Sequence, residues 1–291
     1  MCDETDLARW AKSGLSRREF SAIGVAAGIA ACTPVDGAKA GAEGLAESKV
    51  SFATQDGTMD AFFVHPSSGK APAVILWPDI AGLREAKMAM ARRLAGEGYA
   101  VLAVNPYYRD TPAPQFADFA DFSAKGGFQM VGPWRAKLDP EAIARDAKAI
   151  VAWLDAQEAV DTAKGIGAQG YCMTGSFAIR TVAAAPERVK AAASFHGGGL
   201  VGEDAASPDK LLAPSAQYLI AIAQNDDAKA PGDKDALRKA ADAAGVKAEI
   251  EVYPADHGWC VLDAPSYNQP EADRAWGRLL ALYGAALKGG A

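Results

Sequence analysis

The sequence predicts an α/β fold in which one doubly wound, mostly parallel sheet carries helices on both faces. Short apolar runs alternate along the chain with longer segments of helical character, and this alternation is typical of parallel sheets with crossover helices. Two of the runs, Ala73–Trp77 and Tyr99–Val104, are apolar without a break, which indicates strands buried on both faces. One domain of about 200–250 residues would use most of the 291-residue chain.

The predicted elements follow one another in a regular order after an initial hairpin. Asp56-Gly57, between strands at Val50–Thr54 and Met59–His65, is a strong signal for a two-residue turn. After the strand at 73–77 we expect a helix over 84–97, a strand over 99–104, a helix from 140 to about 157 capped by Asp139, a strand over 165–168, a helix over 177–185, strands over 189–195 and 218–223, a helix over 233–244, a strand over 246–253 and a helix over 271–287. Residues 105–138 are rich in proline, glycine and aromatic residues, and an irregular segment of this length predicts a lid or binding loop.

The most informative motif is Gly170-Tyr171-Cys172-Met173-Thr174-Gly175, which places one thiol in a turn between a predicted strand and a predicted helix. A nucleophile elbow has this geometry: the centre of the turn is strained and its flanking residues are small. The N-terminus of the following helix favours a thiolate and any oxyanion beside it. The usual signature is G-x-S-x-G; here Cys172 replaces the serine, and Thr174 stands in place of the last glycine, with Gly175 one position later. We therefore predict that Cys172 is a nucleophile.

Two other interpretations of the same segment remain open. Cys172 can be an inert buried thiol, because free cysteine is among the most buried residue types. Gly165–Gly170 also matches the dinucleotide pattern G-x-G-x-x-G, but its glycines lie within the predicted strand, and the nearest acid, Glu187, follows Pro186 in a loop; the pattern needs a turn and a strand-end acid. The four cysteines form no C-x-x-C pair and the chain has only three histidines, so we expect no metal and no cofactor.

A cysteine nucleophile needs a base and a carboxylate that orients the base. In α/β-hydrolases the chain order is nucleophile, acid, histidine. His65 precedes the elbow, and the only acid between the elbow and His196 is Glu187, which follows Pro186 in a loop. His257 therefore remains as the base. Asp226 and Asp227 follow the preceding strand, and Asp226 is favoured because Ala-Gln-Asn-Asp fits a small-x-x-Asp pattern at this strand end; either aspartate can instead belong to a solvated turn or helix cap.

Residues 50–287 resemble the dienelactone hydrolase family of the α/β-hydrolase superfamily. The marks of the family are Gly170-Tyr171-Cys172, Asp226, and His257 in a Tyr-Pro-x-x-His context. Asp79-Ile80-Ala81-Gly82 resembles the family's Glu-Ile-x-Gly segment, and Asn105-Pro106-Tyr107-Tyr108-Arg109 resembles its Pro-x-x-Tyr-x-Arg segment.

The resemblance implies a mechanism and a role for each matching residue. Cys172 attacks a lactone or ester carbonyl, and His257 then activates water against the acyl-thioester. The backbone N–H groups of Ile80 and Met173 hold the oxyanion. By resemblance Asp79 contacts the resting thiol and Arg109 binds a substrate carboxylate.

The chain also departs from the family pattern. Asp79 is one methylene shorter than the family's glutamate, and Gly258–Asp263 holds no second carboxylate-binding arginine. A general ester or lactone substrate is therefore expected rather than a dienelactone. His196 is either a core histidine or a substrate-facing residue, and Trp259 borders the cleft. Cys260 is expected to be a buried thiol, although a disulfide with Cys172 is left open.

Composition excludes some other partners. The net charge is −6 without a block of Lys or Arg, so nucleic-acid binding has no electrostatic basis. No uncharged apolar run approaches 18 residues, so an ordinary membrane-spanning helix is not expected. We expect a monomer that takes a small-molecule ester or lactone.

The N-terminal segment predicts export. Arg17-Arg18 precedes the uncharged, weakly apolar stretch 22–31, as in twin-arginine signals. Ile29-Ala30-Ala31-Cys32 resembles a lipobox with Cys32 as the lipid acceptor, and cleavage without lipidation is the alternative. We divide the chain into a signal over 1–32, a flexible linker over 33–47 and a hydrolase-like domain over 48–288, exported to the periplasm or lipid-anchored to the bacterial envelope. The competing hypotheses are a frayed helix on a cytosolic enzyme and, for function, an exported binding lipoprotein without turnover.

Overall fold

The computed structural model describes residues 44–288. The predicted signal segment, Cys32 and most of the predicted linker lie outside these residues. Strand β1 begins at Leu45, so regular structure starts inside the predicted linker and before the predicted domain boundary at 48. Across 44–288, no helix has the length and apolar character needed to cross a membrane.

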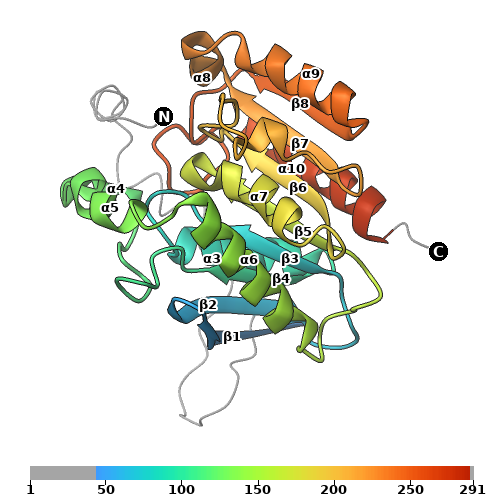
Figure 1. The fold of residues 1–291 in the computed structure, drawn as a ribbon. Helices are drawn as coiled ribbons and strands as arrows, with labels where there is room; N and C mark the ends of the chain where they lie inside the picture. The colour runs from blue at the N-terminus through green and yellow to red at the C-terminus, as the bar shows by residue number, and fades with distance from the viewer. Residues whose placement is uncertain (1–43, 289–291) are drawn as a thin grey trace.

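A single eight-stranded sheet runs through the molecule in the order β1-β2-β4-β3-β5-β6-β7-β8 (Figure 1). Strand β2 pairs antiparallel with β1 on one side and with β4 on the other, and every other pairing is parallel. The mostly parallel sheet predicted from the sequence is confirmed. The strands are β1 (Leu45–Thr54), β2 (Gly57–Pro66), β3 (Ala73–Trp77), β4 (Ala100–Val104), β5 (Ile166–Tyr171), β6 (Val189–Phe195), β7 (Gln217–Ala223) and β8 (Lys247–Tyr253).

The sheet is buried on both faces, as the continuous apolar runs predict. In β3, Ile75 and Trp77 join the core on one face, whereas Val74 and Leu76 join the core on the other, because successive side chains of a strand point to opposite sides. One core is covered by α6 (Pro140–Asp155), α7 (Gly175–Ala184) and α9 (Asp233–Ala244), and the other by α3 (Glu85–Gly96) and α10 (Gln269–Tyr283) (Figure 1).

The N-terminal hairpin is present, with its turn one residue earlier than predicted. Thr54 pairs with Gly57, so the two turn residues are Gln55 and Asp56. Gly57 has a φ of +143°, a conformation that glycine adopts without steric cost. The glycine therefore opens β2.

Several short elements differ from the predicted ones. The segment predicted to be irregular, 105–138, contains α4 (Phe119–Ala124) and α5 (Gly127–Arg135), and α4 is capped by Asp118, which accepts a hydrogen bond from Asp121 N. Strand β5 extends beyond the predicted end at 168 to Tyr171. A short helix, α8 (Gln224–Lys229), follows β7, a 3₁₀ turn spans Pro208–Lys210, and α10 ends at Tyr283 before a π-helical turn, Gly284–Lys288.

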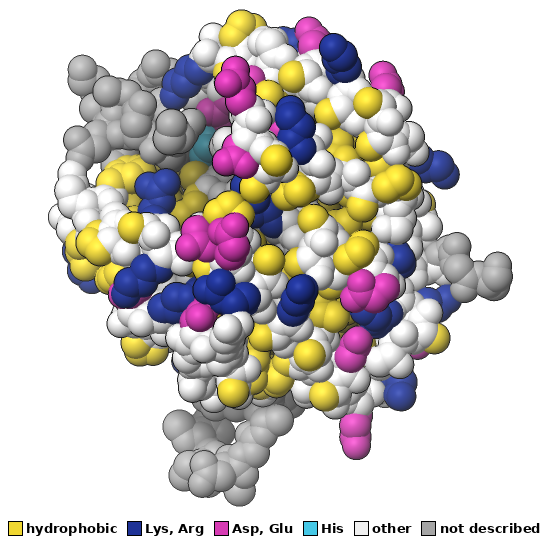
Figure 2. All heavy atoms as spheres, viewed as in Figure 1, with side chains coloured by type: hydrophobic (Ala, Val, Ile, Leu, Met, Phe, Trp, Pro, Cys, Tyr) yellow, Lys and Arg dark blue, Asp and Glu magenta, His cyan; other side chains and the backbone are white. Residues whose placement is uncertain are grey.

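Acidic and basic side chains are interspersed on the face of the molecule shown in Figure 2. Many of them pair with one another, including Arg188 with Asp155 and Arg145 with Asp56. Most exposed pairs of this kind contribute at most about 1 kcal/mol each. The stability of the fold therefore comes mainly from the two apolar cores.

Candidate active site

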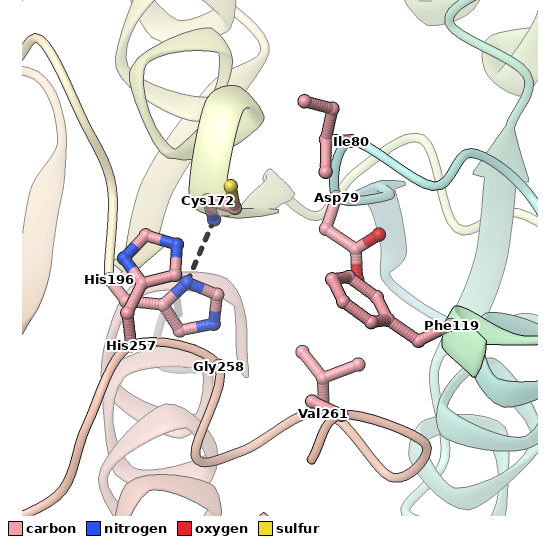
Figure 3. Close-up of a pocket in the computed structure, with 9 residues that line it drawn as sticks. Asp79, Ile80, Phe119, Cys172, His196, His257, Gly258 and Val261 are labelled. Carbon is pink, nitrogen blue, oxygen red and sulfur yellow. Dashed lines mark hydrogen bonds between the residues drawn. The ribbon is translucent and has the colours of Figure 1, made fainter. Parts of the chain in front are cut away.

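The loops that follow β3, β5, β6 and β8 surround one small cavity at the carboxyl edge of the sheet. The space measures about 260 Å³, including its open mouth. Parallel sheets bind ligands at this edge. In Figure 3 the two histidines and Cys172 lie on one side of the space and Ile80, Phe119 and Val261 on the other. The lining residues are Asp79, Ile80, Phe119, Cys172, His196, His257, Gly258, Val261 and Ala264.

Cys172 occupies a strained turn between β5 and α7. Its φ is +56°, a left-handed conformation that costs of order 1–3 kcal/mol for a residue with a side chain. A Cβ on Gly170 would lie 1.9 Å from Thr174 O, and one on Gly175 would lie 2.5 Å from Gly197 Cα. Both positions therefore require glycine, as a nucleophile elbow does.

The structure also explains why Thr174 stands where the signature has a glycine. The Thr174 hydroxyl accepts a hydrogen bond from Tyr171 N at 2.9 Å and donates to Trp77 O at 3.0 Å. The close approach to the next strand is made by Gly175 instead. The threonine thus stabilises the turn, and the role of the missing glycine is taken by its neighbour.

His257 lies at the cavity with Asp226 behind it. His257 Nδ1 is 2.6 Å from Asp226 Oδ2, and His257 N donates to Asn225 Oδ1 at 2.8 Å. Burial alone would lower the pKa of His257, but its interactions with Cys172 and with Asp226 outweigh burial and raise the pKa to about 10. Asp227 points elsewhere, with its carboxylate 2.7 Å from Lys234 Nζ. Of the two candidate aspartates, the structure therefore places Asp226 against the histidine.

His196 also lines the cavity, where it holds the backbone of the elbow. Its Nδ1 accepts the Cys172 N–H at 3.1 Å, drawn as the dashed line in Figure 3. His196 has a φ of +41°, and among residues 44–288 only Cys172 and His196 combine a side chain with a positive φ. Burial, followed by the charges of His257 and Lys87, holds the pKa of His196 well below its ordinary value. A neutral ring keeps the lone pair that accepts the N–H.

Asp79 lines the cavity, but cations hold its carboxylate. Arg84 Nη1 and Nη2 donate to the two oxygens at 2.8 and 3.0 Å, and Lys87 Nζ lies 2.9 Å from Oδ2. Burial raises the pKa of Asp79, yet Arg84 and Lys87 outweigh it and bring the pKa below its usual range. Arg84 also binds Asp263, so the four side chains form a buried charge cluster beside the cavity.

Arg109 is not brought to the cavity. Its guanidinium donates to both oxygens of Asp146 at 2.8 Å and to Asp56 at 2.6 Å, and it lies over the Tyr108 ring. The arginine therefore joins α6 to the β1–β2 turn. Trp259 does not line the cavity either: it is fully buried, stacked on Tyr253 at 5.1 Å and edge-on to His196 at 5.3 Å.

The two residues predicted to form the oxyanion hole share a neighbour. Tyr107 is buried, and its hydroxyl donates to Ile80 O at 2.8 Å and lies 3.7 Å from Met173 Sδ. Ile80 lines the cavity, and Met173 follows Cys172 at the start of the 3₁₀ turn before α7. Tyr107 thus links the loop after β3 to the elbow.

Sequence reasoning missed several residues of the site. Phe119 and Val261 line the cavity, and Arg84 and Lys87 fix the charge of Asp79. Phe119 lies in the aromatic-rich stretch that predicted a lid, so a signal for it existed. The two cations carried no signal, because they belong to an ordinary helical pattern along α3.

Cys172 and Cys260, the two cysteines of the described chain, form no disulfide, so the pairing left open by the sequence is not made. Burial raises the pKa of Cys260 to about 12, which keeps that thiol protonated and inert. Within 44–288 no group of three or more His, Cys, Asp or Glu residues is arranged to hold a metal ion.

A mostly parallel sheet with Cys172, Asp226 and His257 after β5, β7 and β8, and with the cysteine in a strained turn before a helix, defines an enzyme of the α/β-hydrolase fold. The model of the dienelactone hydrolase family matches residues 59–287. The chain belongs to that family and is a hydrolase of the class that acts on ester and lactone bonds.

Relatives with known sequences or structures cover most of the chain. A protein of Methylorubrum extorquens named "Putative carboxymethylenebutenolidase" is 29% identical over 280 residues, which is 92% of each chain. A protein of Salmonella typhi with the same name is 29% identical over 238 residues, 79% of this chain and 84% of its own. The crystal structure of a "Putative Dienelactone Hydrolase" from Klebsiella pneumoniae has a TM-score of 0.70 and 27% identity, over 82% of this chain and 98% of its own.

Proposed function

We propose that the protein hydrolyses esters or lactones with Cys172 as the nucleophile, through an acyl-thioester intermediate. The observation that carries the proposal is the His257–Asp226 contact of 2.6 Å at the cavity that Cys172 lines. The raised pKa of His257, to which Cys172 contributes, favours a thiolate beside a protonated imidazole at neutral pH. That pair is an activated nucleophile.

In the acylation half-reaction, the Cys172 sulfur attacks the substrate carbonyl carbon and the carbonyl oxygen becomes an oxyanion. The N–H groups of Ile80 and Met173 donate to this oxygen. The C–O bond then breaks, the acyl group remains on sulfur, and the leaving alkoxide takes the proton from His257. With Asp226 on Nδ1, the proton leaves from Nε2. In a lactone the resulting alcohol stays tethered to the acyl group.

In the deacylation half-reaction, neutral His257 takes a proton from water and hydroxide adds to the thioester carbonyl. The C–S bond breaks, which releases the carboxylic acid and restores the thiolate and the imidazolium. Asp226 orients the ring in both halves. His196 acts as a positioning residue because its Nδ1 accepts the Cys172 N–H. Tyr107 positions the loop after β3 because its hydroxyl donates to Ile80 O.

Intact-protein mass spectrometry during turnover of p-nitrophenyl acetate tests this proposal. We expect an acetyl adduct of about 42 Da (C₂H₂O) on Cys172, because covalent catalysis transfers the acyl group to the activated nucleophile. Cys260→Ser is the matched control, since Cys260 is a buried thiol outside the catalytic cavity, and it should acylate normally. Wild-type turnover by Cys172→Ala would refute the thioester mechanism.

The competing hypothesis, a binding protein without turnover on a degenerate hydrolase fold, is not favoured. The family match spans 59–287, and the Asp226–His257 contact is in place. The Thr174 departure that suggested degeneracy stabilises the turn instead.

We further propose that the enzyme acts as a monomer, because the side chains of the proposed site all come from one chain. Sedimentation analysis would test this proposal.

We also propose that the chain is exported by the twin-arginine route and lipid-anchored through Cys32. The support is the sequence Arg17-Arg18 before the uncharged stretch 22–31 and the lipobox-like ending. Arg17→Lys with Arg18→Lys should retain the protein in the cytoplasm, because the machinery reads the arginine pair and not merely its charge. Cys32→Ala should release exported protein from the membrane fraction. Wild-type protein that is wholly cytoplasmic with Met1 retained would contradict the proposal.

A further inference from the structure

We propose that the substrate of this cavity has a short, uncharged acyl group, and that acyl groups bearing a carboxylate are rejected. The inference rests on the proposed cysteine mechanism and adds the chemical class of the substrate. Its basis is the lining of the cavity: no lysine or arginine among residues 44–288 presents a hydrogen-bonding group to it, and most of its walls are apolar.

Arg84 is the cation beside the cavity best suited to a carboxylate, and its donors are fully used. A guanidinium has five N–H groups. Nε donates to Asp263 Oδ2, Nη1 to Asp79 Oδ1 and Gly82 O, and Nη2 to Asp79 Oδ2 and Asp263 Oδ1. Its side chain has no exposed surface. Arg84 therefore has no donor left for a ligand.

Lys87 and Arg109 do not line the cavity either. Lys87 has no exposed surface, pairs with Asp79 at 2.9 Å, and has its ammonium 4.1 Å from the centre of the Tyr171 ring. Arg109 is bound by Asp146 and Asp56 and is absent from the cavity lining. The aspartates balance the charges of these cations locally, so within residues 44–288 no lysine or arginine presents an unbalanced charge to the substrate.

The walls of the cavity complete the argument. Beyond the two histidines and Cys172, the side chains that line it are the apolar Ile80, Phe119, Val261 and Ala264, together with the anionic Asp79 (Figure 3). A carboxylate placed against these apolar side chains would lose its hydration without gaining a hydrogen-bond partner, which is costly. An alkyl group would instead gain apolar contacts.

The volume sets the size of the acyl group. Even with its open mouth included, the space measures only about 260 Å³. Phe119, from the first turn of α4, limits the space on the side opposite the histidines (Figure 3). An acyl chain of a few carbons therefore fits better than a long one.

The test compares p-nitrophenyl butyrate with mono-p-nitrophenyl succinate, which replaces the terminal methyl group with a carboxylate. We expect kcat/KM to be at least about 100-fold higher for the butyrate, as for a substrate group that leaves a charge unpaired. Rates of Cys172→Ala are subtracted as background. Loss of both activities in Cys172→Ala supports the cysteine mechanism, whereas the ratio of the two wild-type rates tests the selectivity. The failure of one proposal can therefore be distinguished from the failure of the other.

A cation introduced into the wall sharpens the test. Val261→Arg should shift the kcat/KM ratio toward the succinate by about 10-fold or more, because a guanidinium pairs with a carboxylate through two hydrogen bonds. Val261→Gln, which introduces a polar but uncharged side chain, should not. Arg135→Ala removes an exposed cation of α5 and should leave the wild-type ratio unchanged. Equal Cys172-dependent turnover of the two esters by the wild type, or succinate activity lost in Arg109→Ala, would overturn the inference.

Discussion

His257 and His196 lie side by side at the ends of two strands, yet their chemistry is opposite. Their ring centres are 4.5 Å apart, and only 2% and 1% of each residue is exposed. The pKa of His257 is raised to about 10, whereas that of His196 is held well below its ordinary value. Burial lowers both, so burial does not explain the difference.

The partner of Nδ1 separates the two histidines. On His257 the partner is a carboxylate oxygen of Asp226, which accepts a hydrogen bond and stabilises the charged ring. On His196 the partner is the Cys172 N–H, which donates and so requires a lone pair on the ring. The Nδ1 partner of His257 accepts a hydrogen bond and that of His196 donates one, which supports the proposal that His257 transfers protons and His196 positions the backbone.

Removal of the nucleophile should have the largest effect on this comparison. Cys172→Ala should abolish hydrolysis of p-nitrophenyl acetate, while Cys172→Ser leaves weak activity. Because Cys172 contributes to the raised pKa of His257, that pKa should also fall in Cys172→Ala, as ¹H NMR titration of the ring would measure. An unchanged His257 pKa would show that Asp226 alone sets it.

The histidines themselves should differ next. His257→Ala should lower kcat/KM by at least about 10²-fold, the lower range for loss of a general base. His196→Ala should cost much less in rate but about 1–3 kcal/mol in the free energy of unfolding, because the strained elbow loses its support. Steady-state kinetics with urea denaturation would measure both, and the reverse order of rate effects would remove His257 as the base.

The two adjacent aspartates provide a matched pair of smaller changes. Asp226→Asn should lower kcat by at least about 10-fold, because an amide no longer stabilises the protonated ring. Asp227→Asn should have little effect, since Asp227 contacts Lys234, a half-buried pair of small energetic value. Similar losses in the two variants would mean that the contact of Asp226 with His257 does not orient the base.

The pH dependence of stability should give the smallest effect. The folded-state pKa of His257, about 10, lies above its unfolded value of about 6.5. The stabilisation from its protonation is therefore fully present below about pH 6.5 and is lost as the pH rises toward 10. Wild type and Asp226→Asn both keep Cys172, so the difference between their free energies of unfolding isolates the contribution of the Asp226–His257 contact. That difference should shrink across this window, and a constant difference would contradict the assignment.

Most of the fold could be predicted because its signals are local. The apolar strands β3 and β4, the helix α9 and the hairpin each occupy a few consecutive residues. Strand β5 was predicted too short because Gln169 interrupts its apolar pattern; in the structure Gln169 is buried and bonded to the hydroxyls of Tyr171 and Tyr283. A hydrogen-bonding partner 114 residues away leaves no trace in the strand itself.

In the candidate site, too, contiguous motifs could be predicted, whereas contacts between residues distant in sequence could not. The elbow was visible because its glycines and thiol are contiguous, and the order of the chain restricted the base to His257. The partners of Arg109 could not be predicted, because Asp56 and Asp146 lie 53 and 37 residues from it in sequence and meet only when the hairpin packs on α6. A motif can therefore indicate an arginine without indicating which carboxylate it binds.

The two thiols of the described chain lie in different surroundings, so their labelling rates should report different events. Cys172 lines the cavity, whereas Cys260 is buried with its pKa raised to about 12. An alkylating pulse should therefore label Cys172 at a rate set by its chemistry and Cys260 at a rate set by structural opening. Mass spectrometry of the two peptides would measure both labelling rates in one sample. A rise in the labelling of Cys260 relative to that of Cys172 would report opening of the structure.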